Sequence, residues 1–196
     1  MALVEERAGS DTARRAMIES QLRVSGVNDL TILAAFAAVP REDYVPDAAR
    51  SVAYMDRAVP LGDGSVLAPA LSHGQMLIAA EPVMTDRVLV IGKPGAYLAA
   101  LVSHLVAGVT VATPDGDWDA GAPYSLILID GAIETAPEKL GEILTLDGRV
   151  VTGLIERGVS RLAIGRCVGG ELLFTKLAEA DFAALPEFAA KKSWSF

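Results

Sequence analysis

The chain has 196 residues, of which 52% are hydrophobic, and its mean hydropathy is +0.37 with a formal net charge of −8. This length predicts one domain with a full hydrophobic core. We expect a single domain over 1–196, with a helical and loop region at 12–85 and a sheet region at 86–196. No basic stripe accompanies the acidic charge, which argues against nucleic acid and anionic lipid as partners, because both need clustered Lys and Arg.

The composition also limits cellular location and metal chemistry. No stretch approaches the ~18–20 apolar residues of a membrane span, and the charged N-terminus, Met1–Arg7, lacks the apolar core of a signal peptide. The single cysteine, Cys167, excludes an internal disulfide and a multi-thiolate metal site. We therefore expect a cytoplasmic protein with no membrane span and no metal.

The first region predicts short helices and turns. Gly26 ends the first apolar helical pattern, and Asn28 or Asp29 can cap the second. Farther on, proline and glycine dominate until a third helical pattern precedes the first strand. The predicted elements are helices over Ala13–Leu22 and Leu30–Val39, a turn at Pro60–Gly64, and a helix over His73–Ala80.

From residue 86 onward, β-type runs alternate with helical patterns, which predicts a mostly parallel sheet in an α/β fold. The predicted parallel strands are Val88–Ile91, Val109–Thr113, Ser125–Asp130 and Gly148–Leu154, with helices at Tyr97–Leu105 and Ala136–Leu144. The tail predicts antiparallel strands at Leu162–Val168 and Glu171–Lys176, joined by a turn at Gly169–Gly170.

The segment Val88–Tyr97 has the order strand, glycine turn and helix that opens a doubly wound α/β domain. Ligands bind such domains at the carboxyl ends of the strands, where glycines let backbone N–H groups approach. Gly92, Lys93 and Gly95 are therefore candidate ligand-binding residues. Lys93 either contacts an anion or is a solvated loop lysine.

Two aspartates complete the candidate set. Asp130 ends an apolar strand, a position that suits a functional acid and equally suits an ordinary Asp-Gly turn. Asp115 either accepts a hydrogen bond from a ligand or belongs to a solvated acidic turn. The histidines are expected to be packed or exposed, and Cys167 to be a buried structural thiol. No catalytic residue is therefore assigned.

Six blocks, in the same order, resemble protein-L-isoaspartate O-methyltransferases. They are Gln21–Asp29, Val39–Pro46, Ala53–Gly64, Val88–Gly92, Ala122–Ile129 and Leu146–Val151. The resemblance implies methyl transfer from S-adenosylmethionine to isoaspartyl carboxylates. It also implies a Rossmann-like methyltransferase fold with antiparallel C-terminal strands and added N-terminal helices.

The chain departs from that family in two motifs. The family's Thr-Ile-Ser-Gln-Pro substrate block corresponds to Val66–Ala70, which holds no hydroxyl, although Ser65 and Ser72 lie just outside it. The family's cofactor loop, Glu-Ile-Gly-Thr-Gly-Ser-Gly-Tyr, corresponds to Val90–Tyr97. There the acid is valine, the middle glycine is Pro94 and the last glycine is Ala96. Pro94 removes a backbone N–H and Ala96 adds a Cβ.

One helix–strand unit is shortened, because Val109–Thr113 runs almost directly into Asp115–Tyr124. The loss of this unit removes either the acid that binds the ribose in the family or the residues that line the adenine. Asp115-Gly116 resembles what is left of the family's turn near the adenine. S-adenosylmethionine is the one cofactor that the resemblance implies, and its binding is expected to be weakened.

Three hypotheses follow. The first is a non-catalytic member of the family with a binding or assembly role, as a homodimer or with a protein partner. The second is a working S-adenosylmethionine enzyme with a rebuilt pocket, which would require Gly92, Gly95, Asp115 and Asp130 to converge on one open cavity. The third is a module for another small ligand, such as an anion held by Lys93.

Overall fold

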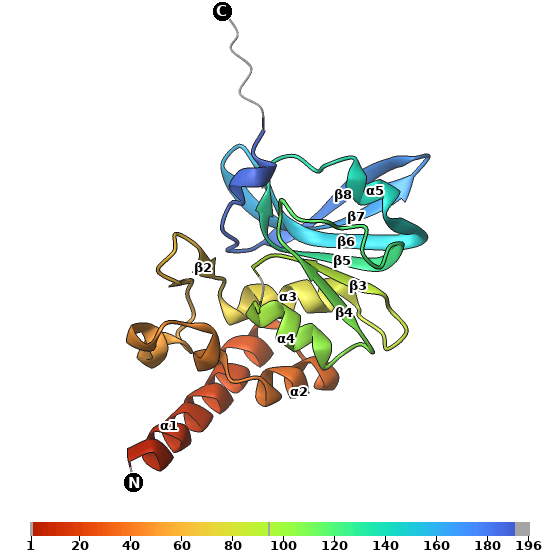
Figure 1. Cartoon of the computed structure of the whole chain (residues 1–196). Coiled ribbons are helices and arrows are strands. Elements are labelled where there is room, and N and C mark those ends of the chain that lie inside the picture. The colour runs from red at the N-terminus through yellow and green to blue at the C-terminus, as the bar shows by residue number, and fades with distance from the viewer. Residues whose placement is uncertain (1, 94, 191–196) are drawn as a thin grey trace, which may run out of the picture.

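A six-stranded sheet of order β4–β3–β5–β6–β7–β8 forms the centre of the computed structural model, which describes residues 2–93 and 95–190 (Figure 1). The strands are β3 Val88–Ile91, β4 Val109–Ala112, β5 Tyr124–Ile133, β6 Leu144–Glu156, β7 Val159–Val168 and β8 Glu171–Glu179. The first four of these run parallel, while β7 and β8 are antiparallel. The predicted α/β class with antiparallel C-terminal strands is confirmed.

Helices and short turns precede and connect the strands. The α-helices are α1 Ala2–Met17, α2 Leu30–Ala38, α3 Ala70–Ala80, α4 Tyr97–Ser103 and α5 Lys139–Glu142. A π-helical turn covers Ile18–Leu22, and 3-10 turns cover Arg23–Ser25, Arg41–Tyr44, Asp47–Val52 and Pro186–Phe188. Strands β1 Val59–Pro60 and β2 Val66–Leu67 form a small hairpin. Within the described ranges, no helix is both long enough and apolar enough to cross a membrane.

Local sequence signals placed several boundaries correctly. The Asp29 carboxylate accepts hydrogen bonds from the N–H groups of Thr31 and Ile32 at 2.8 and 2.9 Å, which caps α2 as predicted. Gly26 has φ +93° where the first helical segment ends. That segment begins earlier than predicted, since α1 starts at Ala2.

The predicted helix over Ala136–Leu144 is wrong, because α5 spans only Lys139–Glu142. Backbone groups at both ends of the predicted helix form hydrogen bonds with distant parts of the chain instead of within a helix. The N–H of Thr135 donates to the Phe188 carbonyl at 3.0 Å, and the Ile143 carbonyl accepts from the N–H of Tyr124 at 2.8 Å. Leu144 already belongs to β6, so pairing with β5 outweighs the local helical pattern.

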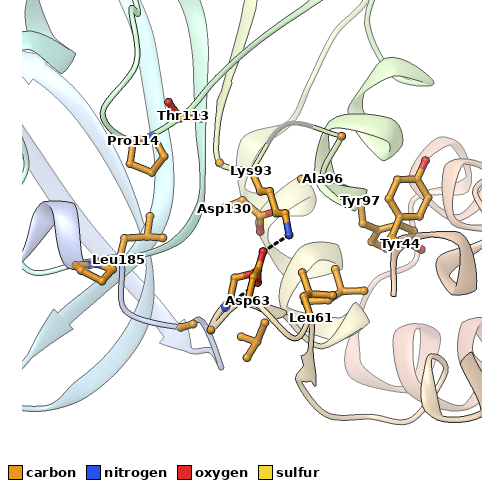
Figure 2. A pocket seen from close by; sticks show the side chains of 18 of the residues that line it. Tyr44, Leu61, Asp63, Lys93, Ala96, Tyr97, Thr113, Pro114, Asp130 and Leu185 are labelled. Carbon is orange, nitrogen blue, oxygen red and sulfur yellow. Dashed lines mark hydrogen bonds and ion pairs between the residues drawn. The ribbon is translucent and has the colours of Figure 1, made fainter. Parts of the chain in front are cut away.

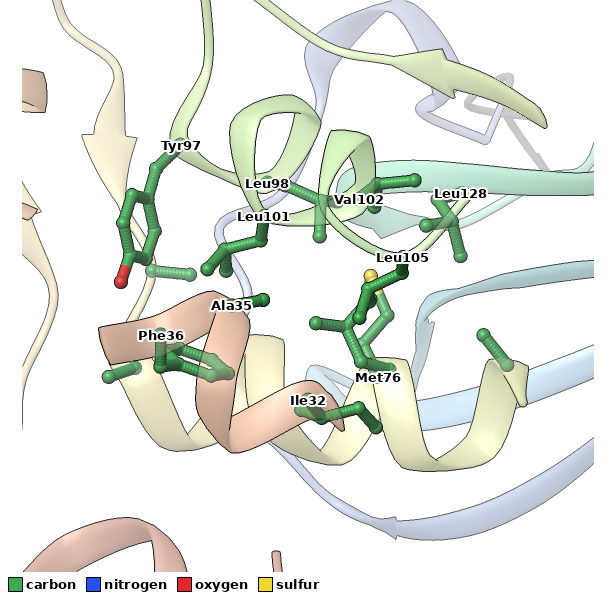
Figure 3. Close-up of a cluster of buried hydrophobic side chains, with 14 of the residues drawn as sticks. Ile32, Ala35, Phe36, Met76, Tyr97, Leu98, Leu101, Val102, Leu105 and Leu128 are labelled. Atoms are coloured by element: carbon green, nitrogen blue, oxygen red, sulfur yellow. The ribbon is translucent and has the colours of Figure 1, made fainter. Parts of the chain in front are cut away.

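One face of the sheet packs against the N-terminal helices. Figure 3 shows Leu98, Leu101 and Val102 of α4 near Ile32, Ala35 and Phe36 of α2, with Met76 of α3 in the same cluster. All these side chains are buried, and alternate residues of β3 and β5 complete the cluster. This side of the fold therefore keeps the helices expected of a doubly wound domain.

The opposite face is covered more sparsely. Residues 113–123, which connect β4 to β5, form neither helix nor strand, so β4 is an edge strand beside β3. Trp118 packs over the buried side chains of this face, and its indole N–H donates to the Thr113 carbonyl at 3.0 Å. The shortened unit predicted from the sequence is thus the one that follows β4, and a coil with one tryptophan takes its place.

A C-terminal segment, residues 180–190, crosses the carboxyl end of β5. The N–H of Ala132 donates to the Ala183 carbonyl at 2.7 Å, and the N–H of Leu185 donates to the Ala132 carbonyl at 2.8 Å. Phe188 is buried beside Trp118, with ring centroids 6.0 Å apart. The segment therefore joins the end of β5 through an isolated parallel bridge between Ala132 and Ala184.

Gly131→Ala is expected to lower the free energy of unfolding by about 1–3 kcal/mol. A Cβ at Gly131 would lie 2.5 Å from Leu185 Cγ, so the C-terminal segment must shift. Urea denaturation measures the change. Gly108→Ala is the matched control, because a Cβ there meets nothing within 4 Å. Adding Leu185→Ala should recover part of the loss, and an unchanged midpoint for Gly131→Ala would refute the steric account.

Candidate functional site

A cavity of about 780 Å³ opens at the carboxyl ends of β3 and β4, beside β5. Its volume lies in the range of small-molecule sites. Figure 2 shows its walls coming from distant parts of the chain. They are Tyr44–Pro46, the β1–β2 hairpin, the loop after β3, the loop after β4, Asp130 and residues 183–187.

All five candidate residues from the sequence line this cavity: Gly92, Lys93, Gly95, Asp115 and Asp130. The convergence follows from topology, since parallel neighbours β4, β3 and β5 end at the same edge of the sheet. It is the geometric condition that the second hypothesis required.

Gly92 and Gly95 of the loop after β3 are suited to glycine for different structural reasons. A Cβ at Gly92 would lie 3.0 Å from the Asp130 Cβ, so a side chain there would displace the aspartate. Gly95 has φ +73° and open space within 4 Å of its missing side chain. At Gly92 the missing side chain allows the Asp130 Cβ to pack against the loop. At Gly95 the space beside the backbone stays open.

Asp130 is held by a histidine that sequence reasoning did not connect to it. His73 Nε2 of α3 lies 2.8 Å from Asp130 Oδ1. The His73 side chain is 0% exposed and that of Asp130 is 14% exposed. His73 is packed, as predicted, but its partner is 57 positions away in the chain, and no local spacing signals such a contact.

Arg41 lies against Tyr97, one of the lining residues, and was also missed by sequence reasoning. Its side chain is fully buried, with Nε donating to the Ala53 carbonyl at 2.7 Å and Nη2 donating to the Ala68 carbonyl. The guanidinium carbon lies 5.1 Å from the centre of the Tyr97 ring. Burial lowers the pKa of Arg41, and burial also raises the pKa of the Tyr97 hydroxyl. The Val39–Pro46 block that carried the family resemblance contains this arginine, which is the signal that could have identified it.

Lys93 is half-exposed and forms an ion pair with Asp63 of the β1–β2 hairpin, as the dashed line in Figure 2 marks. Its ammonium group is therefore already matched by a carboxylate, which favours the solvated alternative over a contact with a bound anion. Asp115 is exposed, as the acidic-turn alternative expects, yet it also lines the cavity. Asp115 can therefore belong to a solvated acidic turn and still be in a position to accept a hydrogen bond from a ligand.

The Lys93 ammonium and the Ser65 hydroxyl and N–H hold the pKa of Asp63 well below its ordinary value. We therefore expect Asp63 to stay ionised as the pH falls through ~4, where a free aspartate titrates. Lys93→Met should return the pKa toward that value. Because the lowered pKa belongs to the folded state, the small stabilisation is present above the ordinary pKa and disappears as the pH falls through the lowered one.

Carboxyl NMR titration of Asp63 tests this expectation. Lys139→Met, which removes the comparable surface partner of Asp119, is the control and should leave the Asp63 titration unchanged. A wild-type Asp63 that titrates at its ordinary pKa would show that the ion pair does not persist in solution.

Part of the block Val66–Ala70, which holds no hydroxyl, lines the same cavity. Val66 and Leu67 line it, and Ser65 does too, with its hydroxyl donating to Asp63 Oδ1. Ser72 is buried and donates to the Asp181 carbonyl at 3.1 Å. Of the two serines that flank the block, Ser65 reaches the cavity and Ser72 is used elsewhere.

Two solved structures have the same fold. One is a protein-L-isoaspartate O-methyltransferase, with a TM-score of 0.75 and 19% identity over 90% of this chain and 67% of that one. The other is a putative protein-L-isoaspartate O-methyltransferase from Plasmodium falciparum, in complex with S-adenosyl-L-homocysteine. It has a TM-score of 0.72 and 13% identity, covering 91% of this chain and 98% of that one.

Relatives found by sequence have a higher identity to this chain than these two structures do. A protein-L-isoaspartate O-methyltransferase from Roseiflexus castenholzii is 32% identical over 88% of this chain and 91% of its own length. Protein-L-isoaspartate O-methyltransferase 2 from Anaeromyxobacter is 32% identical over 74% of this chain and 71% of its own length. The family profile described as Protein-L-isoaspartate(D-aspartate) O-methyltransferase matches residues 12–114. The chain therefore belongs to the protein-L-isoaspartate O-methyltransferase family of S-adenosylmethionine-dependent methyltransferases.

Proposed function

We propose that this protein binds an S-adenosyl ligand in the cavity beside β3 and does not methylate isoaspartyl carboxylates. The observation that carries the binding part is the convergence of Gly92, Gly95, Asp115 and Asp130 on one cavity. In this proposal the protein is a binding member of its family. It acts alone or assembled with a second copy or a partner protein.

The lining residues fit such a ligand. S-adenosylmethionine presents an ammonium group, ribose hydroxyls and an adenine amino group, all of which donate hydrogen bonds, and carboxylates are strong acceptors for them. Asp115 lines the cavity from the loop after β4, and Asp115-Gly116 resembles what is left of the family's turn near the adenine. Gly95, with no neighbour within 4 Å of its missing Cβ, leaves the loop open to close approach.

The affinity should be lower than in members of the family with an intact glycine loop. One lost charge-assisted hydrogen bond costs about 1.5–3 kcal/mol, which is roughly one to two decades in the dissociation constant. Here Ala96 replaces a family glycine and a coil at 113–123 replaces a helix–strand unit. We expect dissociation constants from about ten micromolar to about one millimolar.

The acceptor side of the cavity argues against isoaspartyl repair. An isoaspartyl group is a carboxylate, whereas Asp63, Asp115, Asp130 and Glu187 already line the cavity. Lys93, the one basic side chain among its described lining residues, is paired with Asp63. Like charges repel in a partly buried cleft. Val66 and Leu67 also stand in place of polar residues, so this part of the lining offers no side-chain hydroxyl to hold the acceptor.

A methyltransferase with a different acceptor is the second candidate, and the position of Asp130 favours it. S-adenosylmethionine supplies an electrophilic methyl group when bound. Asp130, hydrogen-bonded to His73, lines the open cavity and is placed to accept a proton from a neutral acceptor. Such an acceptor would be uncharged or cationic, for the electrostatic reason given above.

Isothermal titration of the purified full chain with S-adenosylhomocysteine, combined with an isoaspartyl-peptide methylation assay, tests the proposal. The Roseiflexus castenholzii relative serves as positive control for the assay. We expect saturable binding and no methyl ester above background. Methylation of the peptide at a rate near that of the relative would refute the loss of repair activity, and absence of binding at millimolar ligand would refute the binding site.

A further inference from the structure

We propose that the His73–Asp130 pair makes the cavity select for positively charged ligands, so that S-adenosylmethionine binds more tightly than S-adenosylhomocysteine. The inference rests on the proposed function and names the property by which that site discriminates. The two ligands share every group except the methyl group on sulfur. That group turns a neutral thioether into a sulfonium cation, so their relative affinity isolates the effect of one charge.

The Asp130 carboxylate is fixed from two sides. His73 Nε2 contacts Oδ1 at 2.8 Å, and the Asp130 Cβ packs where a Cβ on Gly92 would come within 3.0 Å. Oδ2 accepts no hydrogen bond from the described residues. One carboxylate oxygen is therefore held by the protein, and the other is left to whatever enters the cavity.

His73 is buried in a way that suits a hydrogen-bond donor to Asp130. Its side chain is 0% exposed, and Nδ1 has no hydrogen-bond partner among the described residues. A neutral ring with its proton on Nε2 leaves only a lone pair unmatched at Nδ1. A protonated ring would bury an unpaired N–H, which is more costly. Tyr97 and Phe182 enclose the ring, with centroids 5.8 and 6.3 Å away, so the histidine has little freedom to turn.

The charges around the pair leave the cavity acidic. Lys93 is neutralised by Asp63, while Asp115 and Glu187 are exposed lining residues without a basic partner among the described ion pairs. Arg41 is a buried cation near the pair. Two carbonyls and the Tyr97 ring hold its guanidinium group, and the Asp130 carboxylate is one of the groups that favour its charged form. Asp130, at 14% exposure of its side chain, is less screened by water than Asp115 or Glu187. It therefore contributes most to the selection.

Isothermal titration of the full chain with each ligand separately gives the ratio of the two dissociation constants. We expect wild type to bind S-adenosylmethionine at least about fivefold more tightly than S-adenosylhomocysteine, as one partly screened charge interaction of about 1 kcal/mol implies. Asp130→Asn keeps the shape of the side chain and removes its charge. It should bring the ratio to less than about twofold, chiefly by weakening the methylated ligand.

Asp115→Asn is the matched control, since it removes the same charge from an exposed residue that lines the same cavity. It should retain more than half of the wild-type ratio. The preference should also shrink as salt is added, because screening weakens interactions between charges.

His73 is tested as a positioning residue. His73→Ala should lower the ratio as Asp130→Asn does, because the carboxylate loses its fixed orientation. His73→Gln, whose amide N–H can donate to Oδ1, should restore a large part of it. A melting temperature for each variant shows that it is folded. If His73→Ala does not fold, Asp130→Asn and His73→Gln still decide the question.

The outcomes separate this inference from the proposed function. No binding of either ligand overturns both. Equal affinities in wild type, or tighter binding of S-adenosylhomocysteine, overturn charge selection and leave the ligand site in place. A preference that survives Asp130→Asn shows that the His73–Asp130 pair is not its source.

Discussion

Arg149→Met is expected to lower the free energy of unfolding by about 3–5 kcal/mol, because it breaks a buried ion pair and leaves one charge unmatched. Arg149 of β6 contacts Asp86 Oδ2 at 2.9 Å, and the two side chains are 12% and 5% exposed. It also donates to the carbonyls of Ala80, Glu81 and Ser125. One side chain thus ties the end of α3 and the approach to β3 to the parallel strands.

The dependence of the free energy of unfolding on acidic pH should also change in Arg149→Met. Burial alone would raise the pKa of Asp86, but hydrogen bonds from Arg149 and Ser125 outweigh burial, so this pKa lies below its ordinary value. The stabilisation is therefore present above the pKa of the unfolded chain and is lost as the pH falls through the lowered folded value. Arg149→Met removes the largest contribution that lowers this pKa, so the loss of stability on acidification should be smaller in the variant than in wild type.

Urea denaturation at neutral and at acidic pH measures both effects. Arg161→Met removes an exposed arginine whose Glu179 partner lies 3.7 Å away, so this control should cost less than about 0.5 kcal/mol. Equal losses in the two variants would contradict the view that burial, and not merely charge pairing, makes Arg149 important.

Arg41→Met is expected to destabilise the fold by about 2–5 kcal/mol, because the Ala53 and Ala68 carbonyls lose their buried donor. It should also weaken ligand binding, since Arg41 joins the chain before β1 to the chain before α3 behind the cavity wall. Arg41→Lys should not rescue either effect, because a single ammonium cannot reproduce the two-pronged contact of a guanidinium.

Thermal unfolding and ligand titration on the same samples check this second expectation. Arg50→Met is the control, as Arg50 is exposed and pairs with the surface carboxylates of Asp47 and Asp43 at 3.2 and 3.6 Å. A folded Arg41→Met variant that binds ligand as wild type does would show that the wall does not depend on this arginine.

The sequence predicted those parts of the fold that local patterns specify. Alternating strands and helices gave the parallel sheet, Asp29 gave the start of α2, and Gly169-Gly170, with φ of +62° and +91°, gave the β7–β8 turn. The convergence of the candidate residues on one edge followed from the same alternation, because the carboxyl ends of parallel strands meet there.

What the sequence could not give depends on contacts between distant residues. His73 and Asp130 are separated by 57 positions and meet only because α3 packs against the sheet. The helix predicted at Ala136–Leu144 was shortened by the Phe188 carbonyl, which belongs to a segment with no pattern of its own. Arg41 lies within the family block Val39–Pro46, but its burial is a property of the folded chain that no local pattern specifies.

The most direct test of the account is a crystal structure of the full chain grown with S-adenosylhomocysteine. The expected result is adenosyl density in the cavity, against the loop of Gly92 and Gly95 and within hydrogen-bond distance of Asp115 or Asp130. A cavity that shows only solvent at saturating ligand, or a ligand seated elsewhere on the protein, would contradict the claim that this family member keeps its cofactor site.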